Sequence, residues 1–304
     1  MRFVPKGDSS AVLLGEPVDS SVDVGLALRK GEEVKVKVYS GKSVLDPGSP
    51  TDKVETVDRV LSPLAEEEIG GSIRCIGLNY RQHAEEMSIP LPDVPTVFLY
   101  VLPSIPRAKP RTNEKLPSKP SQALADPWPA PTPIPKHTLA SNSADYESEL
   151  AVIISKTCKN VTEAEAMDHV LGYTAANDIS SRSSQFAQSQ WCYSKGFDKS
   201  CPLGPVLVST SLVPDVAALK MRGLKNGRVL QDCGLDDMIF SIPQLVSFLS
   251  QGTTLPAGTV IITGTPAGIG AGRTPKEWFK DGDEFVVEIL PHIGSLVNVM
   301  KFEE

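Results

Sequence analysis

The apolar segments of this chain are short, and turn-forming residues separate them throughout. The longest runs, such as LAVII at 150–154, have the length of a strand and cannot span a bilayer. Residues 34–38, VKVKV, alternate apolar and polar side chains, as a half-buried strand does. The 26 prolines disfavour long helices. We therefore expect a β-rich α+β fold that lacks the regular strand–helix alternation of a doubly wound sheet.

The pattern also places individual elements. Strands are expected at 34–38, 54–59, 73–76, 149–155, 172–177, 205–209, 259–263 and 284–289. Helices are expected at 162–170, which opens on the capping-box pattern TEAE, at 242–250, and near Tyr80. A connecting segment ends at Gly70 and Gly71, which mark a boundary. We predict a small β-rich N-terminal domain over residues 1–70 and a larger domain over 71–304.

Composition narrows the class of protein. The formal net charge is −7 and no basic stripe is visible, which argues against a nucleic-acid partner. The first ten residues lack an apolar core, so no secretory signal is expected, and no membrane association is expected either. The five cysteines show no CxxC spacing and suit free thiols in a reducing compartment. A cytoplasmic location is expected, with a mitochondrial one left open.

Carboxylates alternate where a strand enters the core. In the segment DYESELAVIIS, Glu147 and Glu149 lie two residues apart, and Asp145 precedes them by two more. Side chains at such spacing in a strand point to the same face, where like charges repel. The common explanation is a solvated edge, since carboxylates are mostly exposed. The alternative is a site for a metal ion.

Two further groups of polar residues are candidates for chemistry. His83 and Glu86 are three residues apart on the expected helix, so the carboxylate can orient the imidazole as a general base, although a surface pair has the same spacing. Asn177 and Asp178 follow an apolar strand, where ligands often bind, but a helix cap would use the same residues.

The glycine-rich stretch VIITGTPAGIGAG at 260–272 suggests nucleotide binding, but two features exclude it. A Walker loop needs Lys followed by Ser or Thr after its last glycine, and a Rossmann turn needs a long helix afterwards; Pro275 interrupts this one. There is no GxSxG motif for a serine hydrolase and no zinc-type His/Cys cluster. The loop is expected to approach a small ligand closely.

Taken in order, these pieces resemble the fumarylacetoacetate hydrolase family, which includes acylpyruvate hydrolases, oxaloacetate decarboxylases and hydroxymuconate isomerases. The resemblance covers about residues 72–303. It is carried by GLNYRQHAEEM, PTVFLY, PIPKH, DYESELAVII, GYTAANDIS, SKGFDKSCPLGP, the segment from DMIFSIPQLV to TGTPAGIG, and DGDEFVVEI. It implies a mixed β-sandwich roll, a small N-terminal domain and a homodimer.

The resemblance also implies roles for particular residues. It makes Glu147, Glu149 and Asp178 the ligands of a divalent ion, and carboxylate oxygens favour Mg²⁺, with Mn²⁺ or Ca²⁺ as substitutes. The remaining implied roles are water activation by His83 with Glu86, oxyanion stabilisation by Lys195, and substrate binding by Arg182, Gln185, Gly264 and Thr265.

The chain departs from the family pattern at two places. Ser183 follows Arg182 where family members often carry an acid, which leaves open what orients the arginine. Residues 101–118 interrupt the family pattern, and their removal would give VFLYKPSQALADPWP. We interpret this segment as an inserted loop, which could serve as a lid, or as a translated intron.

The function implied by the resemblance is metal-dependent hydrolysis of a carbon–carbon bond in an acylpyruvate, a 2,4-dioxo acid. Oxaloacetate decarboxylation and isomerisation of a hydroxymuconate-type diacid are the alternatives within the family. A remoter alternative is a non-catalytic protein that binds a small 2-oxo acid.

Overall fold

The computed structural model describes residues 1–98 and 121–304. The inserted segment at 101–118 lies outside these residues, so its interpretation stays a prediction. The β-rich α+β fold expected from the sequence is confirmed. Its strands form a closed barrel, a seven-stranded sheet, a five-stranded sheet and a two-stranded ribbon.

The N-terminal residues form the barrel. Its strands and its one described helix are β1 (Arg2–Pro5), β2 (Leu13–Pro17), α1 (Val24–Arg29), β3 (Lys35–Tyr39) and β4 (Pro50–Leu61). Alternation in VKVKV places Val36 and Val38 in the barrel core and leaves the lysines exposed. The barrel packs against the rest of the chain, since Asp23 accepts hydrogen bonds from the backbone and hydroxyl of Ser295. The domain boundary near residue 70 stays a prediction.

Two sheets form the body of the molecule. In spatial order the first holds β6 (Thr96–Phe98), β5 (Ile73–Gly77), β16 (Val260–Ile262), β10 (Ser148–Ile154), β11 (Val170–Asn177), β13 (Cys201–Ser209) and β7 (Leu124–Ala125). The second holds β15 (Arg228–Gly234), β14 (Lys220–Lys225), β17 (Glu284–Leu290), β18 (Gly294–Phe302) and β8 (Pro131–Ile134).

The apolar run of β10 is continuous because both faces of the first sheet are covered. Leu150 and Val152 join the large core that includes Phe285 and Leu296 of the second sheet. The intervening Ala151 and Ile153 join a second core on the opposite face. Strand β10 therefore lies in the middle of the molecule, and side chains at its beginning are carried into the interior.

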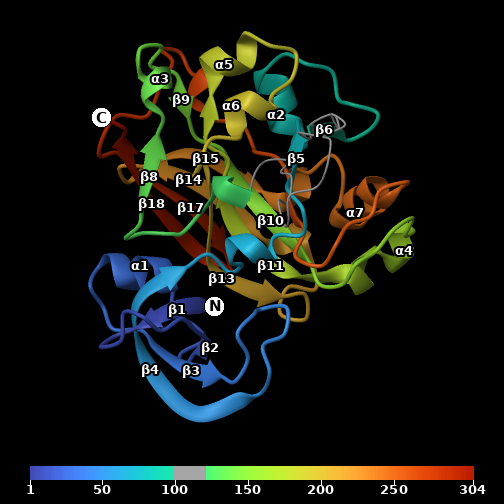
Figure 1. Cartoon of the computed structure of the whole chain (residues 1–304). Helices are drawn as coiled ribbons and strands as arrows, with labels where there is room; N and C mark the ends of the chain where they lie inside the picture. The colour runs from blue at the N-terminus through green and yellow to red at the C-terminus, as the bar shows by residue number, and fades with distance from the viewer. Residues whose placement is uncertain (99–120) are drawn as a thin grey trace, which may run out of the picture.

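Short helices complete the fold. They are α2 (Arg81–Glu86), α3 (Lys136–Leu139), α4 (Glu163–Ala166), α5 (Arg182–Phe186), α6 (Cys192–Lys195) and α7 (Ile242–Ser250), and the ribbon pairs β9 (Ala144–Asp145) with β12 (Ser180–Ser181). Figure 1 places α2, α5 and α6 together at the end of the molecule opposite the barrel. No described helix has the length and apolar character needed to cross a membrane.

Some expected elements differ from the structure. The capping box at Thr162 forms, but the helix expected over 162–170 ends at Ala166, and a single 3₁₀ turn follows. Val170 instead pairs with Ile154 and begins β11, because sheet pairing offers this β-branched residue a buried partner. The hairpin of β14 and β15 and the last strand β18 were not anticipated from the sequence.

Candidate active site

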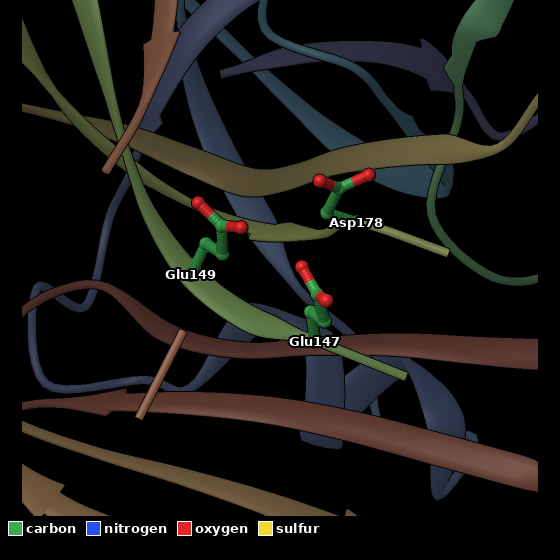
Figure 2. A group of neighbouring side chains, drawn as sticks. All are labelled: Glu147, Glu149 and Asp178. Carbon is green, nitrogen blue, oxygen red and sulfur yellow. The ribbon is translucent and has the colours of Figure 1, made fainter. Parts of the chain in front are cut away.

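Three buried carboxylates meet at the beginning of β10. Ligand atoms of Glu147, Glu149 and Asp178 all lie within 4.8 Å of one another. Figure 2 shows the three carboxylates gathered around one small space. All three side chains are buried, so the solvated edge that their spacing also allowed is wrong.

Sheet register brings these residues together. Glu149 and Ala151 share a face of β10, and Glu147, just before the strand, continues that alternation. Glu149 is paired with Ala176 of β11, and the backbone N–H of Asp178 donates to the carbonyl of Glu147 at 2.9 Å. The antiparallel pairing of the two strands thus places Asp178 beside the two glutamates.

Burial and neighbouring charges shift the pKa values of the two glutamates in opposite directions. Burial raises the pKa of Glu149 well above its usual value, and the charges of Asp178 and Glu147 raise it further. Burial also favours the neutral form of Glu147, but the cations of Lys195 and Arg182 outweigh it and lower the pKa of Glu147 to about 2. The positive charge of Lys195 offsets only part of this rise at Glu149, whereas at Glu147 the two cations prevail.

Lys195, at the end of α6, lies against two of the three carboxylates. Its ammonium donates to Glu147 Oε2 at 2.6 Å, to Asp178 Oδ2 at 2.8 Å and to Ser180 Oγ at 2.7 Å. Burial would lower the pKa of Lys195, but Asp178 and Glu147 raise it above its usual value. The ammonium consequently stays protonated and can supply a fixed positive charge.

Arg182, the first residue of α5, is held by an acid that the family pattern did not indicate. Its Nε donates to Asp145 Oδ2 at 2.8 Å, and its Nη1 contacts Glu147 Oε1 at 2.7 Å and Gln185 Oε1 at 3.0 Å. Asp145 therefore does not join the carboxylate cluster, although it continues the alternation in sequence. Its carboxylate also accepts hydrogen bonds from the backbone N–H groups of Tyr146 at 2.9 Å, Gly270 at 2.8 Å and Ala271 at 3.0 Å.

Ser183 is in the position of the missing family acid, and its described side-chain hydrogen bonds go to other serines and not to the guanidinium of Arg182. Its hydroxyl donates to Ser141 Oγ, and its backbone N–H donates to Ser143 Oγ. The missing acid therefore leaves Arg182 fixed by Asp145. The Nη2 atom of Arg182 is buried and has no hydrogen-bond partner among the described residues, so this donor is available for an anionic ligand.

His83 and Glu86 form the pair expected on α2. His83 Nδ1 lies 2.9 Å from Glu86 Oε2, and both side chains are largely buried. Glu86 Oε1 accepts a hydrogen bond from the backbone of Gly268 at 2.8 Å. One carboxylate thus fixes the imidazole and the glycine-rich loop. With Nδ1–H donating to the carboxylate, Nε2 keeps its lone pair for a proton.

The glycine-rich loop follows β16 and takes conformations that only glycine adopts easily. Gly268 has a φ of +106°, and a Cβ there would lie 2.0 Å from the carbonyl of Leu230. Gly264 has a φ of +95°, and its N–H donates to Glu149 Oε2 at 2.6 Å. That N–H is already used inside the cluster, so substrate binding by Gly264 stays a prediction.

A cavity of about 300 Å³ joins these groups. Its buried polar lining consists of His83, Glu147, Arg182, Gln185, Lys195 and Thr265, and the exposed Thr96 also lines it. The hydroxyl of Thr265 accepts a hydrogen bond from Gln231 Nε2 at 2.8 Å, which fixes its position. The structure therefore gathers the candidate residues around one cavity or directly behind it, while their individual roles remain predictions.

Sequence reasoning did not identify several residues that shape this site. Asp145 was noted only as a third acid in the alternation, Ser180 was assigned no role, and Gln231 was not considered. Asp145 is visible in the motif DYESEL, but its partner is known only once the ribbon of β9 and β12 pairs Asp145 with Ser180, two residues before Arg182.

The donor set suits a hard divalent cation. The three carboxylates belong to a larger buried ionic network that also contains one further acid and two cations: Asp145, Arg182 and Lys195. When all six are ionised, two negative charges remain, which one divalent cation would compensate. The ligands offered by Glu147, Glu149 and Asp178 are oxygens without any thiolate or imidazole, as Mg²⁺, Mn²⁺ and Ca²⁺ prefer.

Known proteins are similar to this chain over most of its length. Residues 72–301 match the family described as fumarylacetoacetate (FAA) hydrolase C-terminal. The chain is 39% identical over 311 residues to a caffeoylpyruvate hydrolase of Neonothopanus nambi, covering 100% of this chain and 93% of that protein. It is 38% identical over 229 residues to an oxaloacetate tautomerase of Bacillus subtilis (strain 168), covering 75% of this chain and 68% of that protein.

Solved structures show the same fold. The crystal structure of a 5-carboxymethyl-2-hydroxymuconate delta-isomerase from Mycobacterium smegmatis superimposes with a TM-score of 0.73 at 27% identity and covers 100% of both chains. The crystal structure described as Cg1458 with inhibitor gives a TM-score of 0.74 at 28% identity, again over 100% of both chains.

Proposed function

The chain belongs to the fumarylacetoacetate hydrolase family of enzymes, and from this premise we propose that it hydrolyses a carbon–carbon bond of an acylpyruvate with the help of a divalent cation. The observation that carries the proposal is the shared cavity. The imidazole of His83, the ammonium of Lys195 and the carboxylate of Glu147 all line it. A base, a fixed positive charge and one member of the carboxylate cluster thus face the same bound molecule.

The proposed cation is Mg²⁺, with Mn²⁺ or Ca²⁺ as substitutes, held by Glu147, Glu149 and Asp178. When bound, it would supply Lewis acidity toward the oxygens of the 2-oxo acid. Arg182 and Gln185 would bind the carboxylate of the substrate, with Arg182 Nη2 as the donor that has no partner among the described residues. Thr265 would bind a second oxygen from the opposite wall.

The chain's own groups would move the proton. Glu86 keeps the Nδ1 proton of His83, so Nε2 would take a proton from water as the resulting hydroxide adds to the acyl carbonyl. Lys195 would stabilise the negative charge that develops on the oxygen of the acyl carbonyl. The bond between the acyl carbon and the methylene carbon then breaks, and its electron pair remains on the pyruvate fragment as an enolate.

Return of the proton from His83 to the methylene carbon completes the reaction. One water is consumed, and the products are a carboxylic acid from the acyl group and pyruvate. No oxidant or reductant is needed. The test is a panel of acylpyruvates, fumarylpyruvate, oxaloacetate and a hydroxymuconate analogue with Mg²⁺ and with EDTA. The proposal expects the enzyme to release pyruvate from an acylpyruvate with Mg²⁺ and not with EDTA.

A second candidate is proton transfer on oxaloacetate without bond hydrolysis. Relatives named oxaloacetate tautomerase favour it, including one from Bos taurus at 36% identity over 273 residues. The same imidazole could move a proton between carbon and oxygen, and no attacking water would be required. Decarboxylation of oxaloacetate and isomerisation of a hydroxymuconate-type diacid are the further alternatives in the panel.

The homodimer and the cytoplasmic location expected from the sequence are also proposals. The Bos taurus relative is described as mitochondrial, which keeps a mitochondrial location open. Size-exclusion chromatography with light scattering tests the dimer, and fractionation of cells tests the location.

A further inference from the structure

The cavity of the candidate active site has two chemically different ends. The polar groups lie at its buried end, where Arg182 is 4% and Lys195 is 2% exposed. Large apolar side chains line the part that reaches the surface: Phe186 is 65% and Ile89 is 47% exposed. The partly buried Met87 and Trp191 also line the cavity, and the exposed Thr96 is the one polar side chain among its exposed described lining. A molecule that fills the cavity therefore has a polar head and an apolar tail.

The positive charges of the described lining are all at the polar end. They are Lys195 and Arg182. Three hydrogen bonds of the Lys195 ammonium go to Glu147, Asp178 and Ser180. Arg182 keeps only Nη2 without a partner among the described residues. The cations of the described lining can therefore bind one carboxylate of the substrate, and the 2-oxo acid head supplies that carboxylate.

A second carboxylate at the far end of the substrate would meet apolar side chains instead. It would lose water against Met87, Phe186 and Trp191, and no described cation lines that end. An uncharged aromatic ring would gain contact with the same surfaces. The cavity volume of about 300 Å³ is at the small end of the range for small-molecule sites, which suits a single ring beside the keto-acid head.

We infer that the apolar end of the cavity is a subsite for an uncharged aryl group, with Phe186 and Trp191 as specificity-determining residues that select aryl-substituted acylpyruvates over diacids. This inference rests on the proposed function and narrows its substrate class. Fumarylpyruvate and oxaloacetate, which carry a second carboxylate, are poor substrates on this account.

Phe186 is the position that tests the inference most cleanly. It is the last residue of α5, and its exposure of 65% leaves room for a longer polar side chain without disturbing the core. Trp191 is less suitable for large changes because it is partly buried and directly precedes α6, which ends at Lys195. For Trp191 the conservative variant Trp191→Phe is therefore the one to use.

The experiment measures kcat/KM of the Mg²⁺-loaded enzyme for benzoylpyruvate, acetylpyruvate and fumarylpyruvate. Wild type is expected to prefer benzoylpyruvate over fumarylpyruvate by at least about 10-fold, the discrimination that a well-matched apolar pocket achieves. Phe186→Ala should shrink this ratio, and Trp191→Phe should retain most of it. Phe186→Arg should reverse the trend by lowering kcat/KM for benzoylpyruvate and raising it for fumarylpyruvate.

The matched control is Phe248→Arg on α7, an exposed phenylalanine that does not line the cavity. It should leave the preference of wild type in place. Calorimetric binding of the same acids to the metal-loaded His83→Ala variant gives a second measurement that does not depend on turnover, and benzoylpyruvate should bind more tightly than fumarylpyruvate.

The outcomes separate the inference from the proposed function. Failure to cleave any acylpyruvate, including acetylpyruvate, would overturn the proposed function, while the binding order would still decide the aryl subsite. Cleavage of acetylpyruvate with equal or better use of fumarylpyruvate would overturn the aryl subsite alone. An unchanged substrate ratio in Phe186→Arg would also overturn it.

Discussion

Arg182 Nε lies 2.8 Å from Asp145 Oδ2, and both side chains are buried. This pair answers what orients the arginine when Ser183 replaces the acid found in many relatives. Asp145 also accepts hydrogen bonds from the backbone of Gly270 and Ala271. The same carboxylate therefore holds a substrate-binding candidate on α5 and the glycine-rich loop, and both line the cavity.

The first prediction concerns this pair. Asp145→Asn removes the charge but keeps one oxygen acceptor, so the fold should survive with a loss of about 2 kcal/mol in the free energy of unfolding, as for a hydrogen bond to a charged group. KM for an acylpyruvate should rise more than kcat falls, because the arginine is misplaced. Denaturation and steady-state kinetics check both effects.

Ser183→Ala is the matched control for Asp145→Asn, since the described hydrogen bonds of the Ser183 hydroxyl all join it to other serines. It should leave KM near the wild-type value. If Ser183→Ala raises KM as strongly as Asp145→Asn does, then Asp145 is not the residue that orients Arg182.

The second prediction concerns Glu149 and metal binding. Mg²⁺ or Mn²⁺ should raise the melting temperature of wild type, because binding to the folded state adds about 2.7 kcal/mol to the free energy of unfolding at a metal concentration of 100 times Kd. Glu149→Gln should lose this response while retaining an acceptor for the N–H of Gly264. Thermal melts with metal and with EDTA provide the measurement, and an equal response in the variant would contradict the ligand assignment.

The free energy of unfolding of the metal-free protein should also depend on pH, because of Glu149. The pKa of this carboxyl is raised above its ordinary value of 4.5, so the folded chain holds the proton more tightly than the unfolded chain. Stability from this group is present below pH 4.5 and is lost as the pH rises through the raised pKa. The difference in unfolding free energy between wild type and Glu149→Gln should therefore shift in favour of the variant as pH increases.

The third prediction concerns water activation. His83→Ala should lower kcat/KM for acylpyruvate hydrolysis by about 10²–10⁴-fold, the usual contribution of a general base. Affinity for Mg²⁺ should be retained, because His83 is not among the carboxylate ligands. Any decarboxylation of oxaloacetate should fall less, since it needs no attacking water. Equal losses in the two reactions would show that His83 does not serve specifically as the base for water.

The fourth prediction concerns the glycine-rich loop. Gly268→Ala places a Cβ 2.0 Å from the carbonyl of Leu230 at a φ of +106°, so the loop must shift and its hydrogen bond to Glu86 must weaken. Strain on the order of 1–3 kcal/mol and a marked loss of kcat are expected. Gly252→Ala is the control, with a φ of +69° and open space around its Cβ. If Gly268→Ala retained the wild-type kcat, the conformation of the glycine-rich loop would not be needed for catalysis.

The sequence was sufficient for features that follow from local pattern. The alternation of Glu147 and Glu149 before an apolar run predicted a strand with both acids on one face, although the pattern alone favoured a solvated edge. The spacing of His83 and Glu86 likewise required one helical face. Those residues do lie together in the structure, because local periodicity and sheet register are consistent there.

Other features depend on pairings between distant segments, which no local pattern determines. The partnership of Asp145 with Arg182 exists because β9 pairs with β12. The shortened helix at 163–166 reflects the competing pairing of Val170 with Ile154. The apolar lining of the cavity joins Met87, Phe186 and Ile269 from three separate segments, so its character appears only when the sheets are assembled.

The central claim is tested most directly by product analysis of one reaction. The purified enzyme is incubated with benzoylpyruvate in the presence of Mg²⁺ and, in parallel, after metal removal with EDTA, and the products are quantified by NMR. The account predicts benzoate and pyruvate in equal amounts with Mg²⁺ and neither after chelation. Equal product formation with and without metal, or keto–enol exchange of the substrate without release of benzoate, would contradict it.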